Sequence, residues 1–261
     1  MSAERSGGRG IVRISHRGGG SLAPENSVEG VEVAIAHGID MVEVDVRVSR
    51  DGALVLSHDP VHHGTTVPVA DATIDELRAN GTPVATLSDA LKAALGRIRV
   101  NLDIKDPRAL EPALEEVRGS NMLDQVIVSC LETPCLARAA QIAPSIPRFF
   151  SYPPDYGGAS SKAWLKPAVD GTVAMMRMTM HMRLLGMLRP VPGTSATIYY
   201  KLMTPKLVNL ARTLGIDLYT WTVDDPAEMR RMITLGVGGI TSNRPDLLAT
   251  LSEDAPSTVT A

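Results

Sequence analysis

The sequence lacks several features that mark particular classes of protein. Its two cysteines, Cys130 and Cys135, form no C-x-x-C pair and have no histidine cluster beside them, so neither a disulfide framework nor a zinc site is indicated. No stretch approaches the roughly 20 apolar residues that a membrane-spanning helix needs. The first ten residues contain Arg and Gly but no apolar segment, so no secretory signal is indicated and a cytoplasmic location is expected.

The chain also carries little net charge. Its 26 basic and 29 acidic side chains leave a formal charge of −3, so we expect no bulk attraction to nucleic acid. Hydrophobic residues make up 44% of the chain, and its 22 glycines and 18 prolines are close to average usage, which excludes a disordered or collagen-like protein. A folded chain of 261 residues is long enough for one α/β barrel.

Short β-branched runs alternate with amphipathic segments along the chain, which predicts parallel strands joined by helices. The candidate strands are residues 11–15, 41–48, 99–104, 125–130, 148–152, 196–200, 218–223 and 239–242. Eight strands predict a (β/α)8 TIM barrel, with a short insertion after the second strand at residues 61–83. We expect one domain over residues 11–250, with flexible termini at 1–10 and 251–261.

The best-marked predicted helix covers residues 27–37. Asn26 is its expected N-cap, Glu29 completes a capping box, and Gly38 ends it. Three apolar residues share its expected inner face: Val28, Val31 and Ile35. Further helices are predicted over residues 74–80, 87–95, 110–118, 205–214 and 226–235.

Acidic residues alternate with apolar ones in two of the predicted strands. In residues 41–48, valines alternate with Glu43 and Asp45. In residues 99–106, Asp103 and Lys105 share one face in the same way. In a barrel these charged faces point inward, near the carboxyl ends of the strands. One interpretation is internal pairing, of Asp103 with Lys105 or of Glu43 with Arg47.

A bound cation is the other interpretation, and the repeated pattern favours it. Buried charges cost several kcal/mol each unless something strong compensates them. Oxygen-only ligands select Mg²⁺ or Ca²⁺ over zinc or copper. The sequence therefore predicts one divalent cation beside Glu43, Asp45 and Asp103.

Two histidines follow predicted strands and so belong to the same rim of the barrel. His16 precedes Arg17 and a glycine run, and His58 follows the apolar residues 54–56. Because imidazole titrates near neutral pH, a pair of histidines can act as general base and general acid. Arg17, beside glycines that bare backbone N–H groups, suits a phosphate group.

These residues together resemble the glycerophosphodiester phosphodiesterase family, in order from about residue 11 to residue 248. The matching motifs are His16-Arg17-Gly18, Pro24-Glu25-Asn26, Glu43-x-Asp45, Asp51-Gly52, His58-Asp59, Asp103-Ile104-Lys105, Trp221 and Thr241-Ser242-Asn243-x-Pro245. The resemblance implies a TIM-type barrel that hydrolyses glycerophosphodiesters to glycerol 3-phosphate and an alcohol, with a bound divalent metal.

Position by position, the resemblance implies a role for seven residues. Glu43, Asp45 and Asp103 match the metal carboxylates, and His16 and His58 match the catalytic acid/base pair. Two cations, Arg17 and Lys105, resemble phosphate contacts. Asp103 stands where the family usually has Glu, and the related sphingomyelinase D-like phospholipases also have Asp at this position. The Arg expected near His63 is missing.

Several alternatives stay open at this point. A lysophospholipase D or sphingomyelinase D-like phosphotransferase, acting on lysophospholipids, is the second candidate, and a non-catalytic phosphate-binding protein is the third. A Schiff-base aldolase using Lys105 is disfavoured, because an acid two residues away would keep the lysine protonated. The sequence leaves a homo-oligomer open.

Two features allow both a structural and a functional interpretation. Trp221 belongs either to the core or to the wall of a glycerol pocket. Residues 173–188 hold six methionines among Arg177, His181 and Arg183, which fits ordinary helix packing or an adaptable entrance for an acyl chain. No site role is expected for His37, and no metal role for His62 or His63.

Overall fold

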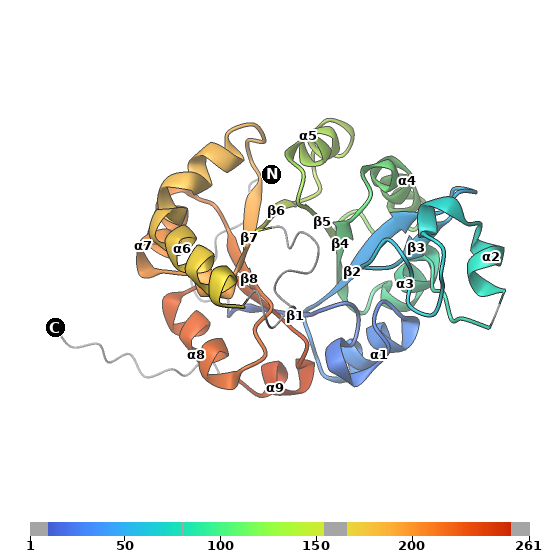
Figure 1. Ribbon diagram of the computed structural model, residues 1–261, viewed down its shortest axis with the longest axis horizontal. Helices are drawn as coiled ribbons and strands as arrows, with labels where there is room; N and C mark the ends of the chain where they lie inside the picture. The colour runs from blue at the N-terminus through green and yellow to red at the C-terminus, as the bar shows by residue number, and fades with distance from the viewer. Residues whose placement is uncertain (1–9, 80, 154–165, 252–261) are drawn as a thin grey trace.

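The computed structural model describes residues 10–79, 81–153 and 166–251, and within them it forms a closed barrel of eight parallel strands (Figure 1). The barrel strands are β1 (Val12–Ser15), β2 (Met41–Val48), β4 (Arg99–Ile104), β5 (Val126–Cys130), β6 (Arg148–Tyr152), β7 (Ser195–Tyr199), β8 (Leu218–Trp221) and β9 (Gly239–Ser242). Each pairs with its neighbour in parallel, and the pairing of β1 with both β2 and β9 closes the ring. The predicted (β/α)8 barrel is confirmed. The termini predicted to be flexible, residues 1–10 and 251–261, lie almost wholly outside the described residues.

Helices surround this barrel, as Figure 1 shows. They are α1 (Val28–Ala36), α3 (Leu87–Ala94), α4 (Leu110–Gly119), α5 (Thr133–Ile142), α6 (Lys166–Leu188), α7 (Pro205–Leu214), α8 (Pro226–Leu235) and α9 (Pro245–Thr250). Short 3-10 turns lie at Gly20–Leu22, Pro107–Ala109 and Tyr200–Leu202. None of the helices in the described part of the chain is both long and apolar enough to cross a bilayer.

Strand alternation divides the apolar residues between two cores. Val42, Val44 and Val46 of β2 point outward and join the large core between the barrel and its helices. Inside the barrel, Ile14, Met41, Ile127 and Phe149 form a separate plug. The plug fills the lower interior, so the polar inward side chains gather at the carboxyl ends of the strands.

The insertion after β2 is built on a strand that the sequence pattern did not predict as part of the sheet. β3 (Leu54–Leu56) pairs antiparallel with the far end of β2, and the short helix α2 (Ile74–Arg78) follows it. A small core of its own holds the insertion together: Val55, Val69, Ala72, Leu77 and Val84. The hairpin extends β2 beyond the barrel and so carries His58, which follows β3, to the rim.

The N-cap predicted for α1 is wrong. Ser27, not Asn26, caps the helix, because its hydroxyl accepts the Gly30 N–H at 3.0 Å while Asn26 lies in a left-handed conformation with φ 54°. The buried face also differs, since α1 buries Gly30, Val31 and Ala34 and leaves Val28 exposed.

A glycine in α1 allows the loop after β1 to lie against the helix. A Cβ on Gly30 would approach the backbone nitrogen of Gly19 at 2.5 Å. We therefore expect Gly30→Ala to lower the free energy of unfolding by about 1–3 kcal/mol, measured by urea denaturation. Gly186→Ala is the matched control: a Cβ there meets nothing within 4 Å, and losing a helical glycine should stabilise slightly. Equal stability of the two variants would contradict this packing.

Candidate active site

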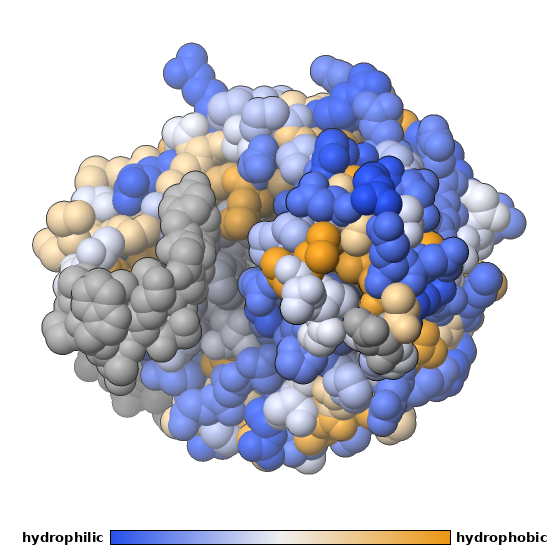
Figure 2. Space-filling model, turned by 45° about the vertical axis from the view of Figure 1, so that its right-hand side comes forward, coloured by the Kyte–Doolittle hydropathy of each residue, from blue (hydrophilic) through white to orange (hydrophobic). Residues whose placement is uncertain are grey.

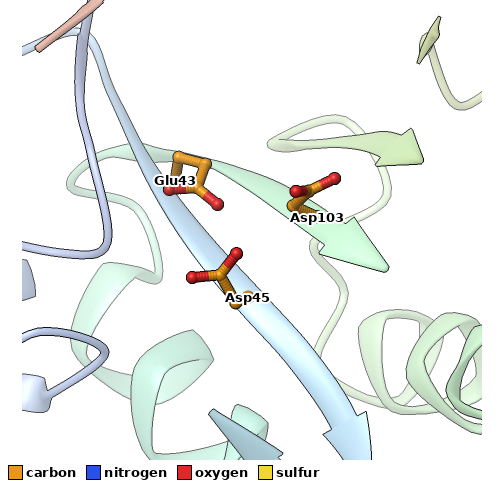
Figure 3. Close-up of side chains that lie close together, drawn as sticks. All are labelled: Glu43, Asp45 and Asp103. Atoms are coloured by element: carbon orange, nitrogen blue, oxygen red, sulfur yellow. The ribbon is translucent and has the colours of Figure 1, made fainter. Parts of the chain in front are cut away.

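Three carboxylates converge inside the upper end of the barrel (Figure 3). Glu43 and Asp45 come from β2, and Asp103 comes from β4, where the strand register sets it opposite Asp45. One oxygen of each carboxylate lies within 4.8 Å of the others, and the three residues are only 5%, 1% and 9% exposed. The structure thus brings together the three acids that the alternation pattern singled out.

Lys105 partly compensates this negative charge. Its Nζ lies 2.5 Å from Asp103 Oδ2 and 3.1 Å from Asp45 Oδ1. Although burial lowers the pKa of Lys105, Asp103 and Asp45 raise it more strongly, so the lysine stays protonated. That removes the neutral amine a Schiff-base mechanism would need. The other predicted ion pair is absent from the salt bridges of the described residues: the Arg47 guanidinium donates to the His58 carbonyl instead of pairing with Glu43.

Excess negative charge remains after this pairing. Burial, Asp45 and Asp103 together raise the pKa of Glu43 well above its ordinary value. Burial raises the pKa of Asp45 as well, but Lys105 and His58 lower it overall. Within the described residues, Asp45 Oδ1 is buried and accepts no hydrogen bond of good geometry. A buried carboxylate oxygen without a well-formed hydrogen bond, within a group of three mutually repelling acids, fits a hard divalent cation, which Glu43, Asp45 and Asp103 would hold.

His16 presents one bare ring nitrogen to this cluster. Its Nδ1 lies 2.7 Å from Asn243 Oδ1, and Asn243 Nδ2 donates in turn to Asp224 Oδ2 at 2.9 Å. Because the amide oxygen can only accept, Nδ1 carries the proton. In the neutral ring Nε2 is therefore the unprotonated nitrogen, and it lies 3.9 Å from Glu43 Oε2. Burial and the charge of Arg17 lower the pKa of His16 to about 4, so the ring is neutral at neutral pH.

His58 follows β3, at the start of the insertion. Its Nδ1 is 2.8 Å from Asp59 Oδ1, and Arg47 holds its backbone carbonyl at 2.7 Å. The side chain is about one third exposed, so solvent reaches it. Both His16 and His58 lie close enough to Asp45 to contribute to lowering its pKa.

A protein-family model agrees with the family resemblance of these site residues. The model of the glycerophosphoryl diester phosphodiesterase family matches residues 16–247. The chain belongs to this family. A glycerophosphodiester phosphodiesterase from Caldanaerobacter subterraneus is 28% identical to it, over 91% of this chain and 96% of its own length. A probable glycerophosphodiester phosphodiesterase 2 from Mycobacterium tuberculosis is 31% identical, over 94% of this chain and 90% of its own.

Solved structures share the barrel. An Oleispira antarctica phosphodiesterase, in complex with the product sn-glycerol-3-phosphate, superposes with a TM-score of 0.71 at 19% identity, covering 90% of this chain and 94% of its own. The chain is therefore an enzyme of the glycerophosphodiester phosphodiesterase class, built on the fold of that class.

Of the remaining predicted residues of this phosphodiesterase, Arg17 lies at the carboxylate cluster. Arg17 donates its backbone N–H to Glu43 Oε2 at 2.8 Å, and its guanidinium pairs with Glu25 at 2.8 Å and lies 3.8 Å from Asp45. Trp221 is half-buried on β8, and its indole N–H donates to the Thr197 carbonyl at 3.3 Å. Its ring centroid lies 5.8 Å from that of Tyr199, which packs against the main core.

Sequence reasoning missed the residues that orient the carboxylates. Asn26 forms two hydrogen bonds of 2.9 Å with Asp45, one to its carboxylate and one from its backbone N–H. Ser129 donates to Asp103 Oδ1 at 2.9 Å. The buried, left-handed Asn26 is thus a positioning residue for the phosphodiesterase site. Its place in the Pro-Glu-Asn motif was the available signal.

Proposed function

We propose that the chain hydrolyses glycerophosphodiesters to glycerol 3-phosphate and an alcohol, with one divalent cation, Mg²⁺ or Ca²⁺, held by Glu43, Asp45 and Asp103. The observation that carries the proposal is the meeting of three buried carboxylates beside the bare Nε2 of His16. When bound, the cation supplies positive charge that polarises the phosphodiester. The names of the relatives and the product bound to the Oleispira antarctica enzyme support the substrate class.

The two histidines divide the proton transfers in this mechanism. His16 is neutral at neutral pH and keeps Nε2 free, so it removes the proton from the attacking hydroxyl. His58, which is hydrogen-bonded at Nδ1 to Asp59, protonates the departing alkoxide. A neighbouring glycerol hydroxyl and a water molecule both satisfy this scheme as nucleophile. A cyclic phosphate among the early products would identify the first.

Other residues bind and orient the substrate. Arg17 and Lys105 are cations beside the carboxylates and would neutralise the phosphate oxygens. Trp221 would form one wall of the glycerol pocket. A cavity of about 250 Å³ lies next to His58, with Glu25, Asp59 and His62 in its lining, and would receive the leaving alcohol.

Metal removal tests the proposal directly. Glycerophosphocholine should be cleaved to glycerol 3-phosphate, and EDTA followed by dialysis should lower the rate by about 10²-fold or more. Adding Mg²⁺ or Ca²⁺ back should restore the rate. Full activity of protein proven metal-free by elemental analysis would contradict the proposed cation.

A parallel assay with lysophosphatidylcholine separates the second candidate activity. Both relatives reported above carry glycerophosphodiester phosphodiesterase names, which favours the deacylated substrate. Release of lysophosphatidic or cyclic phosphatidic acid at a higher kcat/KM would assign the chain to the lysophospholipase D class instead. Binding of the diester without turnover would leave only a phosphate-binding role.

A further inference from the structure

Helix α6 is apolar on two opposite sides. Its inner side buries Met180, Leu184 and Leu188 in the main core. Its outer side carries an exposed row, which we call the α6 outer stripe: Met175, Met178, Met182 and Leu185, with 64%, 77%, 65% and 47% of each residue exposed. Steps of three and four residues set these four side chains in one line along the helix.

Such an arrangement is unusual for a helix on the outside of a barrel. A surface helix normally presents charged and polar residues opposite its buried face, and a helix that is apolar all round is normally covered on both sides. Scattered exposed apolar residues need no explanation, but a continuous row of four marks a contact surface. The ordinary-packing interpretation of the methionine-rich segment therefore accounts for the inner side only.

Positive charge surrounds the α6 outer stripe. Between Asp170 and Asp217 the sequence has no acidic residue and six cations: Arg177, Arg183, Arg189, Lys201, Lys206 and Arg212. Helical spacing places Arg183 on one flank of the stripe and Arg177 on the other. Asp170, at the edge of this region, lies 3.7 Å from Lys201.

The neighbouring helix extends the basic surface. α7 packs beside α6 (Figure 1) and exposes Lys206 and Arg212. In Figure 2, pale-orange apolar atoms gather on the left, the side that carries α6 in Figure 1, while the right-hand side is mostly blue. In a chain whose formal charge is −3, this concentration of one sign is local to the α6–α7 side.

We propose that the α6 outer stripe docks on an anionic lipid bilayer. An interfacial helix buries an apolar stripe at the boundary of headgroups and acyl chains while flanking Arg and Lys residues contact lipid phosphates. Flexible methionine side chains suit a fluid apolar surface. This inference is independent of the proposed chemistry, because none of the α6 side chains that the structure describes belongs to the carboxylate cluster.

Charge decides against the main competing occupant, a second copy of this chain. A twofold interface would set the same patch of both subunits face to face. Arg177, Arg183 and Arg189 of one copy would then approach cations of the other, and residues 171–216 contain no acid to pair with them. An anionic bilayer meets the same cations with opposite charge.

Vesicle sedimentation of the full-length chain tests the proposal. We expect binding to phosphatidylcholine vesicles that contain phosphatidylglycerol to be about tenfold or more tighter than binding to phosphatidylcholine alone, and to weaken with salt. Met178→Gln with Met182→Gln should lower the partition coefficient about tenfold, because the apolar stripe is interrupted. Arg177→Gln with Arg189→Gln should lower it at least as much.

A double variant on the opposite side of the barrel is the matched control. Lys92 is exposed in α3, and Leu95, which follows that helix, is 51% exposed. Lys92→Gln with Leu95→Gln removes one cation and one apolar side chain and should leave vesicle binding unchanged. Equal binding to neutral and anionic vesicles, or equal loss in this control, would overturn the proposal.

Sedimentation equilibrium without lipid tests whether a second copy of this chain binds the α6 outer stripe. A dimer that dissociates in the Met178→Gln, Met182→Gln variant would show that the stripe is an interface between copies and would overturn the bilayer proposal. A monomer in both proteins is the expected result. Circular dichroism spectra that match the wild type would show that α6 still folds in the variants, as expected for substitutions at exposed positions.

Discussion

Glu43→Gln is expected to lower kcat/KM by at least about 10³-fold and, in the metal-free protein, to raise stability by about 1–2 kcal/mol. The loss follows from removing one of three carboxylates that would hold the cation. The gain follows because Glu43 is buried beside Asp45 and Asp103 with a raised pKa, so its ionised form destabilises the fold. The amide oxygen of Gln can still accept the Arg17 N–H.

The gain in stability should depend on pH. Because the pKa of Glu43 is higher in the folded than in the unfolded chain, the destabilisation grows as pH rises from the ordinary pKa of Glu, 4.5, toward the raised folded pKa, and it is relieved on acidification. The difference in melting temperature between Glu43→Gln and wild type, both in EDTA, should therefore be larger at pH 8 than at pH 5. Metal binding should stabilise the wild type and not the variant.

A surface carboxylate provides the control for this pair of effects. Glu29→Gln changes an exposed acid in the first turn of α1, away from the cluster, and should leave kcat/KM unchanged. Its stability should show no gain at pH 8 over pH 5. A Glu43→Gln protein that keeps metal-dependent turnover, or that melts below wild type in EDTA, would contradict the role assigned to Glu43.

Much of the barrel could be predicted because strand periodicity is a local signal. The alternation of valines with Glu43 and Asp45 identifies the inward face of β2 without knowledge of any partner strand. β3 was harder to predict, because three residues in a hairpin give too short a pattern. Its pairing with β2 depends on the turn that follows Val48.

The contacts of the orienting side chains could not be predicted from local patterns, because each contact joins residues that are far apart in sequence. Asn243 contacts His16 across 227 positions, and Ser129 contacts Asp103 across 26. Asn26 shows how a local rule fails: Asn and Ser are both good N-caps, and local propensity could not choose between Asn26 and Ser27. The hydrogen bonds to buried Asp45 decided the outcome in favour of Ser27.

Alanine at either histidine is expected to lower kcat by about 10²-fold or more, with KM for the diester changed much less. His16 would be lost as the base and His58 as the acid, while the carboxylate cluster and the two cations proposed to bind phosphate stay in place. Single-turnover measurement of phosphodiester cleavage would isolate the chemical step. Near-normal turnover of both variants would remove the histidines from the chemistry.

The orientation of His16 can be tested without removing its ring. Asn243→Ala deletes the acceptor for Nδ1–H, and kcat should fall about 10- to 100-fold.

A second variant exchanges the two residues, Asp224→Asn with Asn243→Asp. The hydrogen bond between positions 224 and 243 is kept, because the amide donor and the carboxylate acceptor only change places. The exchange also moves the negative charge next to Nδ1, which should raise the pKa of His16 from about 4 by about 1–3 units. A base with a raised pKa is protonated at higher pH, so the acid limb of the kcat/KM profile should shift upward in the exchange variant. A merely structural contact would restore the rate without moving that limb.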